Sequence, residues 1–200
     1  MNFRHFFVKY CKNGLRSDAT NGDSKKLSLI WIAICILGRL LPHPPNMTPL
    51  CSVCLFSGHK LPSWLSYCVS IISLFVSDAI LSYLYGYDMF GAWSFFTCSG
   101  FLFITFIGSF FMKGELNIGR LFFYVVMASC IFWLWTNFGV WLSYTLYPKN
   151  LDGFISCYVA ALPFLRNSII GDVIFSAAIF YGFSLFRNKM VYLKNINSAV

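Results

Sequence analysis

The sequence predicts an all-α, polytopic membrane protein with six transmembrane helices, and three observations support this fold class. Hydrophobic residues fill 58% of the 200 positions and charged residues only 11%, whereas soluble domains carry about 25% charged residues. The mean hydropathy of +0.68 and the 23 Phe exceed what one small soluble core can hide. From Leu27 onward, apolar runs alternate with short polar breaks. This balance excludes a soluble globular domain, a disordered chain, a collagenous fibre and a disulfide-rich secreted scaffold.

Each expected span is an apolar run bounded by a polar or proline-containing break. The spans are, in order, 27–41, 49–58, 62–85, 91–112, 119–146 and 166–186. The second run is short, and segment 152–164 is apolar but shorter than the ~20 residues that a full crossing needs. We expect an irregularity in the fifth span near Thr136 and Asn137.

Membrane orientation explains the net charge of +8 before nucleic-acid binding does. With six spans, twelve of the 15 Lys and Arg fall on one side of the membrane. They are Arg4, Lys9, Lys12, Arg16, Lys25, Lys26, Lys60, Lys113, Arg120, Arg187, Lys189 and Lys194. Only Lys149 lies in a loop on the other side, so the positive-inside rule predicts that both termini are cytoplasmic. Removing the second span alone would place the later bases outside, against that rule.

The topology divides the chain into three parts. We expect a basic cytoplasmic tail over residues 1–26, a six-helix transmembrane domain over 27–187 and a cytoplasmic tail over 188–200. The first tail lacks the apolar core and cleavage site of a secretory signal peptide. Its acid-poor run 3–10 leaves open a mitochondrial presequence or a segment that lies on an anionic membrane surface. The lipid bilayer is therefore the first expected partner, and no nucleic-acid partner is expected.

Charged groups within membrane spans are costly and are therefore candidates for function. In the expected topology Asp78, Asn137 and Asp172 lie in the outer halves of their spans, and Arg39 ends the first span at the outer face. Trp133 lies too deep for an interfacial belt and shares a helical face with Asn137. We predict an aromatic-lined polar pocket that opens to the outer side. The candidate ligand-binding residues are Arg39, His43, Asn46, Asp78, Trp133, Asn137, Trp141, Tyr158, Arg166, Asn167 and Asp172.

The same charges permit a second interpretation. Arg39 and Arg166 could pair with Asp78 and Asp172 as two buried ion pairs that fix helix register and bind no ligand. Breaking one such pair would cost about 3–5 kcal/mol without any ligand. Small residues let membrane helices approach closely, and a serine stripe on the third span predicts that the neighbouring Asp78 faces protein. The stripe consists of Ser66, Ser70, Ser73 and Ser77.

Motifs that would indicate chemistry are weak. Cys51 and Cys54 form a CxxC pair, but no second Cys or His pair stands near to complete a zinc site. Gly171-Asp172 matches part of an intramembrane aspartyl protease motif, but Ile169 stands where that motif requires Gly. We therefore expect no metal, no cofactor and no catalytic residue, and we expect that the protein is not an enzyme.

Six blocks of sequence carry a family resemblance. They are 39–46 (RLLPHPPN), 77–78, 136–141, 147–148, 157–167 and 171–172. These blocks resemble a family of small bacterial membrane proteins of unknown function, which in turn is similar to the substrate-binding (S) components of energy-coupling-factor vitamin transporters. The resemblance implies six helices, an outward-facing ligand pocket in the bacterial inner membrane, and energy-coupling transmembrane and ATPase subunits as partners. One departure is that Leu37 follows Ala33, which breaks the small-x-x-x-small pattern through which S components often dock.

The leading functional expectation is a component that binds a vitamin-like solute or metabolite and takes it up. Arg39 and Arg166 would receive an anionic group, and the aromatic residues would stack on a ring. A non-transporting membrane scaffold or assembly partner with the same fold is the alternative. An intramembrane enzyme is least favoured, because no nucleophile–base pair can be named.

Overall fold

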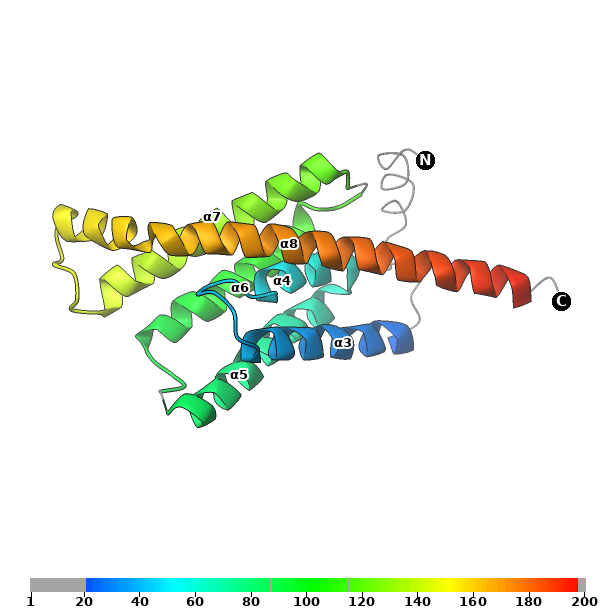
Figure 1. Cartoon of the computed structure of the whole chain (residues 1–200), viewed down its shortest axis with the longest axis horizontal. Helices are drawn as coiled ribbons and strands as arrows, with labels where there is room; N and C mark the ends of the chain where they lie inside the picture. Colours follow the sequence, from blue (N-terminus) through cyan, green and yellow to red (C-terminus); the bar gives the residue numbers. More distant parts are fainter. Residues whose placement is uncertain (1–20, 87, 115, 198–200) are drawn as a thin grey trace.

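The computed structural model describes residues 21–197 apart from positions 87 and 115. This described part contains six α-helices and no strand, which confirms the all-helical expectation (Figure 1). Residues 1–20, which hold most of the predicted basic tail, lie outside the described residues. The helices are α3 (Asn21–Leu40), α4 (Leu50–Lys60), α5 (Ser63–Tyr85), α6 (Ala92–Phe110), α7 (Ile118–Ser143) and α8 (Leu151–Asn197).

The expectation of six transmembrane spans is wrong. Four described helices are long and apolar enough to cross a membrane, namely α5, α6, α7 and the Leu151–Leu185 part of α8. Helix α4 has 11 residues and is about 16 Å long, whereas the hydrocarbon core is about 30 Å thick. Helix α3 begins at Asn21, earlier than expected, and its first two turns carry Asp23, Lys25 and Lys26. Only its later, apolar part suits a hydrocarbon environment, and that part is too short to span.

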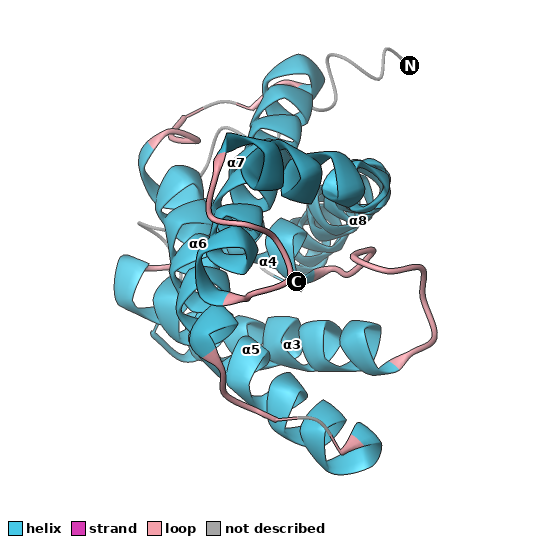
Figure 2. Cartoon of the chain, turned by 90° about the vertical axis from the view of Figure 1, so that its left-hand side faces the viewer, coloured by secondary structure: helices cyan, strands magenta, loops and turns pink. Residues whose placement is uncertain are grey.

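Helix α4 lies in the middle of the bundle. It packs against all five other helices, and Figure 2 shows it between α7 and α8 on one side and α3 and α5 on the other. Every residue of α4 is buried. A short helix is tolerated at membrane depth when protein rather than lipid surrounds it, so α4 is a core element and not a span.

Helices α4 and α6 approach each other backbone to backbone. A Cβ added to Gly58 would lie 2.9 Å from the Ser109 nitrogen, and one added to Gly108 would lie 3.1 Å from the Leu55 carbonyl carbon. Ordinary contacts between such atoms are about 3.5–4.0 Å. Glycine at both positions is therefore what allows this close packing.

The correction to four spans leaves the expected sidedness of the loops unchanged. Two consecutive helices, α3 and α4, are removed from the count of spans. Because that number is even, α5 still begins on the side of the membrane where α3 begins. Figure 1 shows the end of α4, the α6–α7 connection and the C-terminal part of α8 toward the same end of the bundle. Cytoplasmic termini remain a prediction from the positive-inside rule.

Helix α8 joins two segments that the sequence analysis kept apart. It runs unbroken through segment 152–164 and the expected sixth span, with Pro163 inside the helix. Proline is tolerated in membrane helices because neighbouring groups satisfy the backbone. The long first part of α8 packs along α7. Helix α7 is also continuous through Thr136 and Asn137, so the expected irregularity there is wrong.

The α3–α4 loop, residues 41–49, lies against both α3 and α8; its residues 41–46 are exposed and Pro49 is buried. The loop packs closely against a glycine of each helix. A Cβ on Gly38 would lie 2.7 Å from Pro49 Cδ, and a Cβ on Gly171 would lie 2.7 Å from Met47 Cγ. The Asn167 side-chain amide donates to the Pro45 carbonyl at 3.2 Å. The loop is thus seated in the fold and brings its polar residues next to α8.

Candidate functional site

A cavity of about 610 Å³ lies beneath the α3–α4 loop, and all six described helices contribute to its wall. This volume is within the range of small-molecule sites, about 300–1,000 Å³. The wall contains hydroxyl groups and the aromatic rings of one Tyr and two Phe. It also contains one Arg, one His and one Asp. The lining residues are Arg39, Leu40, Leu41, Pro42, His43, Asn46, Thr48, Cys51, Leu81, Tyr85, Thr97, Phe101, Ser129, Phe132, Thr136, Ser168 and Asp172.

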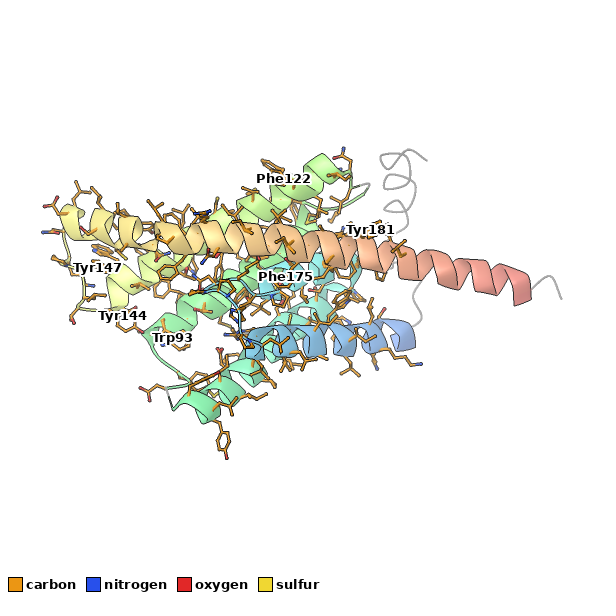
Figure 3. The ribbon with its side chains drawn as sticks, in the orientation of Figure 1. Trp93, Phe122, Tyr144, Tyr147, Phe175 and Tyr181 are labelled. Carbon is orange, nitrogen blue, oxygen red and sulfur yellow. The ribbon has the colours of Figure 1, made fainter. Side chains whose placement is uncertain are left out.

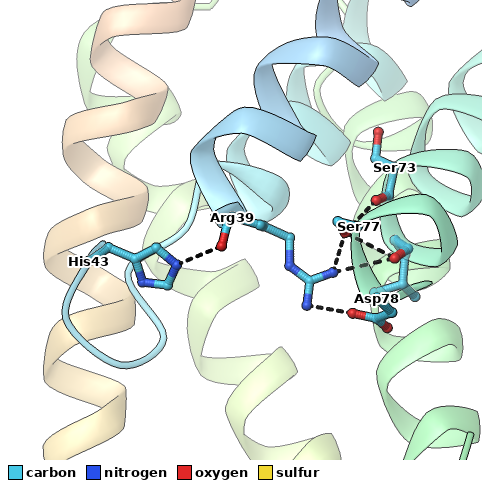
Figure 4. Close-up of polar contacts among 6 residues, drawn as sticks. Arg39, His43, Ser73, Ser77 and Asp78 are labelled. Carbon is cyan, nitrogen blue, oxygen red and sulfur yellow. Dashed lines mark hydrogen bonds and ion pairs between the residues drawn. The ribbon is translucent and has the colours of Figure 1, made fainter. Parts of the chain in front are cut away.

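Arg39 forms an ion pair with Asp78 at one side of this cavity (Figure 4). The Arg39 Nη2 atom lies 2.7 Å from Asp78 Oδ1, and Nη1 donates to Ser77 Oγ at 2.6 Å. Asp78 is 6% exposed, as expected for a carboxylate that faces protein. The pair joins the end of α3 to the C-terminal half of α5. The positive charge of Arg39 is therefore already compensated within the chain.

Asp172 lies on α8 and is 4% exposed, yet it lines the cavity. Its Oδ2 atom accepts a hydrogen bond from Ser129 Oγ at 2.6 Å. The backbone carbonyl of Asp172 accepts from Ser52 Oγ at 3.0 Å. Helices α4 and α7 thus hold Asp172 in place on α8. Among the described residues, no Lys, Arg or His forms an ion pair with it.

The rim of the cavity is formed by the α3–α4 loop. The exposed His43 ring lies 3.0 Å from the Pro44 carbonyl oxygen through Nδ1 and 3.4 Å from the Arg39 carbonyl oxygen through Nε2. Asn46 has a φ of 63°, a left-handed conformation that Asn adopts more readily than most residues. Its carbonyl accepts from Ser168 Oγ at 3.5 Å. These contacts hold the rim against α3 and α8.

The predicted aromatic residues lie outside the cavity lining, between α7 and the first part of α8. Trp133 Nε1 donates to the Ala161 carbonyl at 2.9 Å, and the Tyr158 hydroxyl donates to the Leu134 carbonyl at 2.8 Å. The Trp133 and Tyr158 rings meet edge to face, with centroids 5.2 Å apart. Trp141 Nε1 donates to the Pro148 carbonyl at 3.0 Å. These rings join two helices in this structure.

The other predicted polar residues are also placed outside the lining. Asn137 donates to the Trp133 carbonyl one turn earlier on α7, at 2.8 Å. Asn167 holds the loop, and Arg166 is exposed on α8. Of the two ion pairs considered from the sequence, the structure forms the Arg39–Asp78 pair, and within the described residues Arg166 and Asp172 are not paired. Figure 3 shows Tyr144 and Tyr147 in the connection between α7 and α8, and Trp93 at the start of α6.

The structure therefore brings together four of the predicted residues, Arg39, His43, Asn46 and Asp172, as cavity-lining groups. It adds residues that the sequence analysis did not single out for the site. On α7 these are Ser129, Phe132 and Thr136, at offsets of three and seven residues. That spacing marks one helical face, which differs from the face of Trp133 and Trp141.

Fold and cavity together define a helical protein with four membrane-spanning candidates around a short buried helix and a polar, loop-covered cavity. The chain belongs to the family of unknown function DUF6580, whose family model matches residues 21–195. This confirms the expected membership of a family of unknown function. No curated protein and no solved structure is significantly similar to the chain. The resemblance to S components gains no support from these comparisons.

Proposed function

We propose that this protein binds a small polar solute in the cavity beneath the α3–α4 loop and serves in its uptake from the outer side of a bacterial inner membrane. The single observation that carries the proposal is the cavity itself, which is large enough for a metabolite and mixes hydroxyls, aromatic rings and a buried carboxylate. Such a wall combines an apolar lining with a few placed polar groups, as small-molecule sites do.

The position of the cavity supports uptake rather than a closed structural void. Its wall includes Tyr85 at the end of α5 and Thr97 near the start of α6, together with the exposed rim residues Leu41 and His43. The end of α5, the start of α6 and the α3–α4 loop lie toward the end of the bundle opposite the start of α3 (Figure 1). Under the positive-inside rule that end faces outward. Partner energy-coupling and ATPase subunits belong to this proposal only through the sequence resemblance.

The test is native mass spectrometry of protein that has been gently solubilised from its membrane. Thr97→Trp fills the cavity from α6, whereas Phe103→Trp on the same helix replaces a side chain that is 47% exposed to the surroundings. We expect a bound solute on the wild type and on Phe103→Trp, and none on Thr97→Trp. A solute that persists on Thr97→Trp, or a wild type that is always empty, contradicts the proposal.

A non-transporting scaffold is a second candidate, and the Arg39–Asp78 ion pair favours it. This pair satisfies both charges within the chain, as expected for groups that fix helix positions and bind no ligand. A scaffold would have a protein partner that co-purifies with the wild type and also with Thr97→Trp. A solute transporter would instead lose uptake with Thr97→Trp at an unchanged protein level.

A further inference from the structure

We infer that the cavity selects a small organic cation, a solute with a protonated amine that pairs with Asp172. This inference rests on the proposed function and names the chemical class of its solute. The sequence alone had suggested an anionic solute received by arginines. The charges that line the cavity point to the opposite sign.

The charged side chains that line the cavity favour a cationic solute. Three strongly ionisable side chains line the cavity: Arg39, His43 and Asp172. Arg39 is neutralised by Asp78 at 2.7 Å. His43 lies at the exposed rim with its ring against backbone carbonyls. The deep part of the cavity is therefore left with Asp172 as its one acidic or basic side chain that has no ion-pair partner among the described residues.

The second step is the set of hydrogen-bond partners of that carboxylate. A carboxylate offers about four acceptor sites, and Ser129 supplies one donor, to Oδ2 at 2.6 Å. A buried carboxylate without a cation is costly, because its Coulomb energy is uncompensated away from water. An ammonium group in the cavity would bring three donors and the missing positive charge. A simple carboxylate or phosphate solute has no positive charge to offer.

The third step is the aromatic part of the wall. Phe101 and Phe132 both line the cavity, with ring centroids 4.4 Å apart, and Tyr85 lines it nearer the mouth. Ring faces attract cations and contribute about 0.5–2 kcal/mol when the pair is desolvated. Ser129 and Phe132 stand about one turn apart on α7, and Ser129 binds the carboxylate of Asp172. The carboxylate and the Phe132 ring are therefore close enough for one solute to reach both. This combination suits an amine attached to an apolar or aromatic body.

The test compares matched solutes that differ in charge alone as far as chemistry allows. The probes are phenethylamine, phenethyl alcohol and phenylacetate, and in a second set butylamine, butanol and butyrate, titrated into purified protein at neutral pH by calorimetry or thermal shift. We expect the amines to bind at least tenfold more tightly than the alcohols and acids. We expect Asp172→Asn to weaken amine binding by tenfold or more, since a hydrogen bond to a charged group is lost.

A second variant, Ser129→Ala, tests the inference even if Asp172→Asn does not fold. Ser129→Ala keeps the carboxylate and frees one of its acceptor sites, so the amine preference should be retained or increased. Alcohols or acids that bind as well as amines, or amine affinity that is equal in the wild type and Asp172→Asn, overturn the inference and leave the proposed function standing. If neither probe set binds and the wild type also carries no solute by mass spectrometry, both fail. A co-purified anionic solute that is lost with Thr97→Trp refutes the inference alone.

Discussion

Replacing Gly108 by Ala should destabilise the bundle although it adds a single methyl group. A Cβ at Gly108 would lie 3.1 Å from the Leu55 carbonyl carbon and 3.2 Å from Leu55 Cα, where about 3.5–4.0 Å is favourable. Helices α4 and α6 must therefore separate by several tenths of an ångström. Because every residue of α4 is buried, the helix has no free side toward which it can move.

The expected magnitude follows from two opposing terms. Overpacking of a close-packed interior costs about 1–3 kcal/mol. Helix propensity returns at most about 1 kcal/mol when Gly becomes Ala. We expect Gly108→Ala to lower the free energy of unfolding by about 1–2 kcal/mol. Gly58 contacts the same interface from α4, so the double variant should cost less than the sum of the single ones.

The assay is reversible unfolding in mixed micelles, followed by circular dichroism against the mole fraction of denaturing detergent. Gly182→Ala on α8 is the matched control, since no atom lies within 4 Å of its added Cβ. This control should leave stability unchanged or slightly raised. The packing argument is refuted if Gly108→Ala is as stable as the wild type, or if Gly182→Ala is destabilised to the same extent.

Three further predictions concern the polar contacts. Arg39→Ala should cost about 3 kcal/mol of unfolding free energy because it leaves Asp78 buried and unpaired, whereas replacing both by Leu should cost much less; detergent unfolding of the single and double variants checks this. Trp133→Phe should cost about 1 kcal/mol through the lost bond to α8, while Trp64→Phe, at a side chain that is 58% exposed, should be neutral in the same assay. Asn167→Ala should weaken solute binding in a titration while stability changes by less than ~1 kcal/mol, because it releases the cavity rim; unchanged affinity would contradict this role.

Composition and periodicity were sufficient for the helical membrane fold but not for the number of spans. Apolar runs do not reveal whether lipid or protein surrounds them. Helix α4 is mostly apolar before its final His59 and Lys60, yet it is buried on all sides by other helices. Likewise we expected segment 152–164 to be separate from the span that begins at residue 166, whereas α8 runs unbroken through both and packs along α7.

The site was predicted in part for a related reason. Polar residues at one depth identified Arg39, His43, Asn46 and Asp172, which the structure gathers around the cavity. On α7 we predicted that the aromatic face of Trp133 and Trp141 lines the site, but the face of Ser129, Phe132 and Thr136 lines the cavity instead. Both faces have helical spacing, so the sequence does not distinguish them. The aromatic face is the one that packs against α8, which leaves the other face to line the cavity. In the expected spans Ser129 lies in the inner half and Asp172 in the outer half, so no signal in the sequence connects the two residues.

The most direct test of the central claim, a cavity that solutes reach from one side, is thiol labelling of Thr97→Cys. The variant is made together with Cys51→Ser, because Cys51 also lines the cavity, and is exposed to a membrane-impermeant reagent in spheroplasts and in inverted vesicles. Phe103→Cys in the same background measures labelling at a site outside the cavity. We predict that position 97 reacts from the outer side and is protected by the co-purifying solute. Labelling from neither side, or from the inner side alone, would contradict the account.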